Sequence, residues 1–255
     1  MERLKGNKKI ILRYFICLIG ITIAACKKAA HSPALLPDIA SNLVLNIPLD
    51  GSAYETISNT KGVINKAEPT LDRHNVINKA MLFNRTDSAY IDFGNIANAS
   101  LLSNEFTIAC WIYVRDTTKA VAILSKRNLL GPFEYSIDNH FDIHNFNFDN
   151  WIANGSTTVY GIDPLDADAP IYLQSWHHIT YVANKINLKI YVDGQLKTGI
   201  DARIGNNTFP ATTAHFVIGN GGAYNQNHYF NGAIDDIKIY NKALDEATIK
   251  YLSGL

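Results

Sequence analysis

The sequence predicts an all-β protein, built as an antiparallel two-sheet sandwich with one short C-terminal helix. Short runs in which apolar and polar residues alternate recur along most of the chain. Turn signals such as Asp50-Gly51 and Asp193-Gly194 separate these runs, and one segment near the C-terminus has a helical pattern. Many short strands divided by regular turns are typical of sandwiches and barrels.

The strands are expected in a regular series along the chain. Residues 43–49 alternate before the first Asp-Gly turn, and residues 106–114 are expected to form a central strand. The other strands are expected at 80–83, 89–93, 120–126, 133–137, 140–146, 176–182, 188–192, 216–218 and 234–240. Residues 147–170 are rich in Asn, Asp, Gly and Thr, which predicts a long ordered loop or an extra hairpin.

The C-terminal helix has a start signal and a stop signal. Asp245 can accept a hydrogen bond from the backbone N–H of Ala247 or Thr248, and Glu246 is favourable in the first turn. Gly254 follows as a stop. We therefore expect a single short helix that packs through its apolar side chains onto the sandwich.

Residues 1–25 resemble a bacterial lipoprotein signal peptide and are excluded from the fold. A basic start precedes an apolar run at 16–25, which is too short to span a bilayer comfortably. The run ends in Ala24-Ala25-Cys26, a small-residue cleavage site followed by cysteine. The resemblance implies that Cys26 becomes an acylated N-terminus, with chains such as palmitate in the membrane. The alternative is an ordinary secretory signal with a chance cysteine.

The segments after the leader are expected to be a tether, residues 26–42, and one domain, residues 43–255. This organisation predicts a membrane-anchored lipoprotein of the bacterial cell envelope, at the outer membrane, on its periplasmic or its surface side. The whole chain has 23 Lys+Arg and 23 Asp+Glu, and the leader holds five basic residues and one acidic residue, which leaves 18 and 22, a net charge of −4. Such a balance excludes an electrostatic footprint for nucleic acid. Cys110 lies in an apolar strand and is expected to be a buried free thiol.

Eight sequence pieces, in order, resemble the laminin-G-like jelly rolls of the concanavalin A-like lectin/glucanase superfamily. They lie at residues 47–51, 81–83 with 90–94, 106–114, 123–126, 176–179, 191–194, 218–219 and 232–237. No single piece is specific, but the order of all eight over residues 47–237 is specific. The resemblance implies a jelly-roll sandwich used mainly for binding, often to glycans.

Several residues of these pieces are expected to have structural roles. Trp111 and Trp176 are interpreted as core or sheet-face packing. His177 and His178 resemble a metal pair, but neighbouring residues of a strand point to opposite faces and cannot easily chelate one ion. We expect one of these histidines to be hydrogen-bonded inside the sandwich and the other to be exposed.

Three aspartates are candidate ligands for a structural Ca²⁺. Asp50 ends the first strand, Asp235 and Asp236 begin the last, and the resemblance implies that these two strands meet. Oxygen ligands from loops suit Ca²⁺, and many relatives hold such an ion near these positions. The alternative is that Asp235 caps backbone N–H groups or pairs with a basic residue, without metal.

The ligand-binding candidates are polar and aromatic residues outside the family pattern: Phe133, Trp151, Tyr160, Tyr224, His228 and Tyr229. Aromatic rings can stack on the C–H faces of sugars, and variable loops concentrate binding residues. Each candidate also has a packing interpretation.

Catalysis has little support in the sequence. Glycoside hydrolysis needs two positioned carboxylates. Glu134 and Asp138 are four residues apart and share a face of an expected strand, but they lack the third member of the E-x-D-x-x-E motif of the related glucanases. The leading hypothesis is a non-catalytic carbohydrate-binding module on a lipoprotein. The alternative is an interaction or adhesion module for an envelope or extracellular protein, and a polysaccharide hydrolase or lyase is third.

Overall fold

The computed structural model describes residues 36–101, 105–116, 119, 121–128, 134–138, 147–153, 157–162, 173–201, 212–221 and 227–254. In 147–153 and 157–162, and at 198, 200 and 201, the description covers the backbone. Residues 37–255 form a compact unit of their own. Cys26, Phe133, Tyr224 and the strand expected at 140–146 lie outside the described residues.

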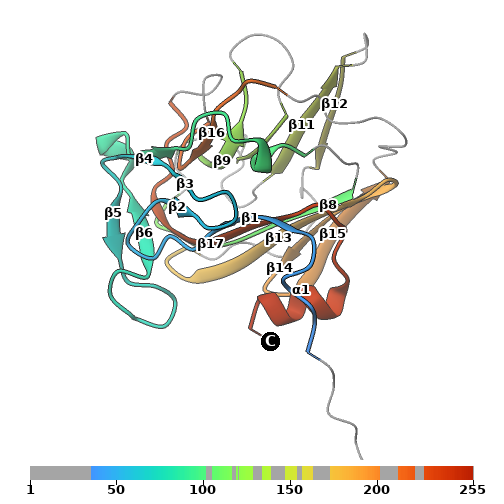
Figure 1. Cartoon of the computed structure of the whole chain (residues 1–255), viewed down its shortest axis with the longest axis horizontal. Helices are drawn as coiled ribbons and strands as arrows, with labels where there is room; N and C mark the ends of the chain where they lie inside the picture. Colours follow the sequence, from blue (N-terminus) through green and yellow to red (C-terminus); the bar gives the residue numbers. More distant parts are fainter. Residues whose placement is uncertain are drawn as a thin grey trace, which may run out of the picture. The chain divides into compact units, whose positions relative to one another are not determined.

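Two antiparallel sheets dominate the described part of the chain (Figure 1). The first sheet, called here sheet A, has the order β15-β14-β13-β8-β17-β6-β5, with β1 also paired to β17. Its strands are β1 (Leu43–Ile47), β5 (Glu68–Thr70), β6 (Ala80–Phe83), β8 (Glu105–Val114), β13 (Trp176–Asn184), β14 (Asn187–Val192), β15 (Gln195–Asp201) and β17 (Gly232–Tyr240). The strand of residues 106–114 is central, as expected.

The second sheet, sheet C, has the order β12-β11-β10-β9-β16-β7-β4. Its strands are β4 (Val63–Asn65), β7 (Tyr90–Asp92), β9 (Ala122–Lys126), β10 (Tyr135–Asp138), β11 (Asn147–Ala153), β12 (Thr157–Ile162) and β16 (Phe216–Ile218). A small ribbon of β2 (Tyr54–Glu55) and β3 (Thr60–Lys61) and two short helices, η1 (Arg85–Asp87) and η2 (Ala97–Ala99), complete the loops. Because β11 pairs with β12, part of segment 147–170 is a hairpin rather than a loop.

The hydrophobic core lies between the two sheets. In β8 every second residue, from Phe106 through Cys110 to Val114, belongs to the core, together with Tyr135 of β10 and Phe216 of β16. Burial of the Cys110 thiol raises its pKa, so this cysteine is an inert core residue, as predicted. The alternate residues of β8 therefore face away from the core.

The C-terminal helix α1 (Glu246–Leu252) covers part of that outward face of sheet A. Asp245 caps it, since its side chain accepts a hydrogen bond from the Thr248 N–H at 2.7 Å, which confirms one of the two predicted bonds. Ile249 packs on Val182 of β13 and Tyr191 of β14. None of the helices in the described residues has the length and hydropathy needed to cross a membrane.

Candidate ligand-binding face and the charged cluster beside it

Four ring-bearing side chains lie together on the outward face of sheet A, and we call them the outward patch: Trp111, Tyr113, Trp176 and His178. The antiparallel register pairs Trp176 with Tyr113 and His178 with Trp111. The ring centroids of the first pair are 5.9 Å apart and those of the second 5.1 Å, both with inclined planes. Trp111, Tyr113 and Trp176 are half-buried, so their rings keep surface for a ligand.

His178 is a neutral member of the outward patch. Burial, helped by the charges of Lys238 and Arg73, lowers its pKa to about 4. Sequence reasoning placed His177 and His178 on opposite faces, but it expected one of them to be exposed. That expectation is wrong, because His178 is covered down to 3% exposure, with the ring of Trp111 packed beside it.

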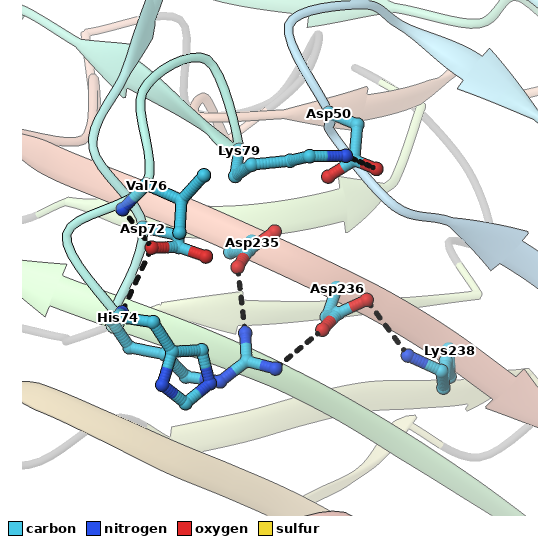
Figure 2. Close-up of polar contacts among 9 residues, drawn as sticks. Asp50, Asp72, His74, Val76, Lys79, Asp235, Asp236 and Lys238 are labelled. Atoms are coloured by element: carbon cyan, nitrogen blue, oxygen red, sulfur yellow. Dashed lines mark hydrogen bonds and ion pairs between the residues drawn. The ribbon is translucent and has the colours of Figure 1, made fainter.

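Arg73 joins this patch to a charged cluster, which consists of Arg73, Asp235, Asp236 and Lys238. Its guanidinium lies over the Trp111 ring, 4.7 Å from the centroid, in a cation–π contact. Nη1 donates to Asp235 Oδ2 at 2.8 Å and Nη2 donates to Asp236 Oδ2 at 3.0 Å, so one side chain bridges two adjacent carboxylates (Figure 2).

A β-bulge in β17 allows both carboxylates to reach the same arginine. Neighbouring residues of a regular strand point to opposite faces. Here the register with β8 shifts between Asp235 and Lys238, and Asp236 has a φ of 50°. A bulge bends the strand and redirects a side chain, which turns Asp236 back toward Arg73 and Lys238.

The pKa values of the two adjacent carboxylates, Asp235 and Asp236, are shifted in opposite directions. Burial, with the charge of Asp236, raises the pKa of Asp235 to about 7 in spite of the ion pair with Arg73. Burial also disfavours ionisation of Asp236, but its contacts with Lys238, 3.0 Å away, and with Arg73 lower its pKa overall. Asp236 therefore carries the permanent negative charge of the pair.

The loop that supplies Arg73 is fixed by Asp72. Its Oδ1 accepts hydrogen bonds from the N–H groups of His74 and Val76, at 2.8 and 2.7 Å (Figure 2). The sequence carried no signal for the role of Arg73, because its partners lie 162 and 163 residues away.

The aspartates predicted as Ca²⁺ ligands are brought into this region, since β1 pairs with β17. Each one, however, faces a basic side chain: Asp50 pairs with Lys79 at 2.6 Å, and Asp235 and Asp236 share Arg73. Within the described residues no group of three or more His, Cys, Asp or Glu side chains could hold a metal ion. The arrangement does not fit Ca²⁺, which prefers about six to eight oxygen ligands, and it favours the ion-pair alternative.

The structure describes four of the predicted ligand-binding residues, with the backbone alone at Trp151 and Tyr160. Trp151 pairs with Val159 and Tyr160 with Asn150, so the two aromatic residues occupy alternating positions of the β11–β12 hairpin. His228 and Tyr229 are half-buried on the segment before β17, and the Tyr229 ring is tilted 37° against that of Tyr90 at 6.4 Å.

The candidate catalytic carboxylates are both buried in ion pairs. Glu134 is paired with Lys126 at 3.4 Å and accepts hydrogen bonds from Ser100 and Thr212. Asp138 is paired with Arg127 at 3.2 Å and accepts from the Ser136 hydroxyl at 2.8 Å. Burial lowers the pKa of Lys126, although the Glu134 charge opposes this. Buried pairs of this kind do not supply the open acid and nucleophile that glycoside hydrolysis needs.

The fold and the patch define a jelly-roll β-sandwich with an aromatic outer face. Residues 85–250 match the concanavalin A-like lectin/glucanases superfamily. This match covers more than half of the chain, so the protein belongs to that family, which confirms the resemblance seen in the sequence. No curated protein matches this chain.

Solved structures share the fold at low sequence identity. Domain 4 of AbnA, an extracellular arabinanase from Geobacillus stearothermophilus solved with arabinotriose, has a TM-score of 0.63 and 17% identity, with 83% of this chain and 98% of that chain covered. The binding domain of Paraclostridial Mosquitocidal Protein 1 has a TM-score of 0.63 and 17% identity (83% and 52% covered). The binding domain of botulinum neurotoxin DC, in complex with rat synaptotagmin II, has a TM-score of 0.58 and 17% identity, with 84% of this chain and 51% of that chain covered. The chain spans about half of each toxin domain.

Proposed function

We propose that this protein is a carbohydrate-binding module that does not itself cleave glycosidic bonds. The outward patch carries the proposal. Trp111, Tyr113 and Trp176 offer partly exposed rings to the apolar C–H face of a sugar. Arg73 and Asp236 lie at one end of the patch and can bond hydroxyl groups.

The comparisons support a binding role without naming a ligand for this chain. The arabinanase domain shares the fold and was solved with arabinotriose. The burial of Glu134 and Asp138 in ion pairs agrees with a module that binds without cleaving.

The proposal extends to the membrane. Signal-like residues 1–25 and Cys26 support a lipid-anchored protein of the bacterial envelope, at the outer membrane. The compact unit begins at Pro37, so residues 27–36 of the expected tether 26–42 would reach on the order of 33 Å when fully extended, at about 3.3 Å per residue. Incorporation of labelled palmitate, lost in Cys26→Ala, tests this part.

A glycan array followed by calorimetry on residues 27–255 tests the binding function. The compact unit begins at Pro37, so this chain keeps the whole sandwich. Trp176→Ala and Tyr113→Ala should weaken binding by roughly 10-fold or more, because each removes a stacking ring. Tyr251→Ala is the matched control, since Tyr251 is an exposed aromatic residue on α1, 41% accessible. Binding that survives both patch substitutions would place the ligand elsewhere.

A protein-interaction module is the second candidate, and the loop after β5 favours it. Leu71, Val76 and Ile77 are exposed there at 47, 48 and 72%. Asp72 accepts two backbone hydrogen bonds within the same loop. Affinity capture from envelope extract, with Ile77→Asp as the comparison, would recover one stoichiometric partner if this candidate is right.

A further inference from the structure

A serine, a histidine and an aspartate form a continuous hydrogen-bond chain at one end of sheet A. Ser175 Oγ lies 2.9 Å from His177 Nε2, and His177 Nδ1 lies 2.7 Å from Asp193 Oδ2. We propose that Ser175 is an activated nucleophile that hydrolyses small carboxylic esters, with His177 as the proton carrier and Asp193 as the positioning residue. This activity is separate from glycan binding and uses none of the outward patch.

Local structure fixes the position of each of the three hydrogen-bonded residues. Ser175 and His177 are two residues apart at the start of β13, so they project to the same side. Asp193 lies in the turn after β14, where its N–H donates to the His178 carbonyl at 2.8 Å. Its Oδ1 accepts from the His178 N–H, also at 2.8 Å, which leaves Oδ2 for His177.

These contacts assign the proton positions on the His177 ring. Burial works against ionisation of Asp193, but its hydrogen bonds with His177 and with the His178 N–H lower its pKa, so it stays a carboxylate at neutral pH. A carboxylate at Nδ1 requires a proton on that nitrogen. Nε2 then presents its lone pair to the Ser175 hydroxyl, the arrangement of a nucleophile with its general base.

The three hydrogen-bonded residues differ in solvent exposure, and this difference suits the proposed reaction. The His177 side chain is only 9% exposed, which shields the base from water, whereas Ser175 is half-buried and can meet a substrate. Gln174 precedes it with a φ of 59°, and its N–H is held by the Val114 carbonyl at 2.8 Å.

The reaction balances without any other reagent. Ser175 Oγ bonds to the acyl carbon while its proton passes to His177 Nε2. The bond between that carbon and the leaving alcohol oxygen breaks, and His177 returns the proton to this oxygen. Water then attacks the acyl-serine with the same base and releases the acid, which restores Ser175.

A fluorophosphonate probe tests the nucleophile on residues 27–255. Labelling should be confined to Ser175 by peptide mass spectrometry, and p-nitrophenyl acetate should be hydrolysed with the same dependence. Ser175→Ala should abolish both. Asp193→Asn should lower the labelling rate by roughly 10-fold or more, because it favours the wrong tautomer of His177.

Two further variants separate chemistry from packing. His215→Gln is the matched control and should leave labelling unchanged. His215 also pairs with an aspartate, Asp92, at 2.9 Å, but it is 60% exposed and lies directly before β16, in the other sheet. In Ser175→Cys the new thiol should react with iodoacetamide at a lowered pKa, and Asp193→Asn should raise that pKa again. Cys110 is buried and does not compete.

The inference is overturned if the folded wild type is labelled no faster than Ser175→Ala, or if the Ser175→Cys thiol titrates like a free cysteine. The three residues would then serve to hold the turn of Asp193 against β13. Because the glycan experiment uses neither Ser175 nor the probe, failure of one proposal is distinguishable from failure of the other.

Discussion

Arg73 lies 4.7 Å above the ring of Trp111 while it holds two carboxylates of β17. The contact joins three distant parts of the chain: the loop after β5, the central strand β8 and the last strand β17. Because the guanidinium is planar and has five donors, it can stack on the ring and hydrogen-bond the carboxylates at the same time. The charged cluster therefore links the loop after β5 to β8 and β17 on the outward face of sheet A.

Replacement of Arg73 should destabilise the fold. Arg73→Ala leaves the Asp235 carboxyl, whose side chain is 3% exposed, without the guanidinium that donates a hydrogen bond to it, and the loss of that donor from a buried polar group is costly. We expect a loss of about 2 kcal/mol in the free energy of unfolding, less than the roughly 3–5 kcal/mol of fully buried pairs, because Arg73 itself is 23% exposed. Urea unfolding measures it.

The exposed ion pair between Lys79 and Asp50, which lies in the same region, supplies the comparison. Lys79 and Asp50 are each 47% exposed, so Lys79→Ala should leave the unfolding midpoint close to that of the wild type. Equal effects of the two substitutions would show that Arg73 stabilises nothing beyond a surface ion pair.

Asp235 should make stability depend on pH in an unusual direction. Its folded pKa is about 7, above the ordinary value of 3.8, so between these pH values the folded state binds more protons than the unfolded state. The contribution of Asp235 to stability is then full below pH 4 and is lost as the pH rises through 7. Carboxylates with lowered pKa, such as Asp236, act in the opposite sense.

The difference between the wild type and Asp235→Asn isolates this effect. Asparagine does not titrate, so the wild type should lose stability relative to the variant as pH rises from about 4 to 8. Urea midpoints at several pH values give the comparison. A constant difference across that range would mean that Arg73 keeps Asp235 ionised throughout.

The fold was predictable because strand patterns and turn residues are local. Residues 106–114 alternate in a way that anticipates β8, and Asp245 marks the start of α1 within one residue. The same alternation also shows that Trp111 and Cys110 must face opposite ways. It does not show which of the two faces the core, and the sequence interpretation left Trp111 between core and sheet face.

The charged cluster and the hydrogen-bond chain were not predictable for the same physical reason. Arg73 meets Asp235 only after the strands between them have paired, and a bulge in β17 decides where Asp236 points. Ser175 and Asp193 were assigned no chemistry, because a serine before a strand and an aspartate in an Asp-Gly turn have common structural roles. The geometry that gives them a shared partner, His177, is set by tertiary structure.

Gly232 should be intolerant of any side chain. A Cβ at this position would lie 1.9 Å from the Tyr113 carbonyl oxygen, which belongs to the neighbouring strand and cannot move aside. Gly232→Ala should therefore cost about 3 kcal/mol or more, or prevent folding. Gly199→Ala is the control, since its nearest neighbour would be the flexible Lys189 side chain at 3.2 Å; soluble yield and thermal unfolding report both.

Calcium should leave the stability of this protein unchanged. An ion that binds only the folded state at 100 times its Kd stabilises it by about 2.7 kcal/mol, which would raise the unfolding temperature by several degrees. Thermal unfolding of residues 27–255 in excess Ca²⁺ and in excess EDTA should coincide, because Arg73, Lys79 and Lys238 already neutralise the three candidate aspartates. A calcium-dependent rise that disappears in Asp236→Asn would reverse this conclusion, since Asp236 could then have exchanged its basic partners for the ion.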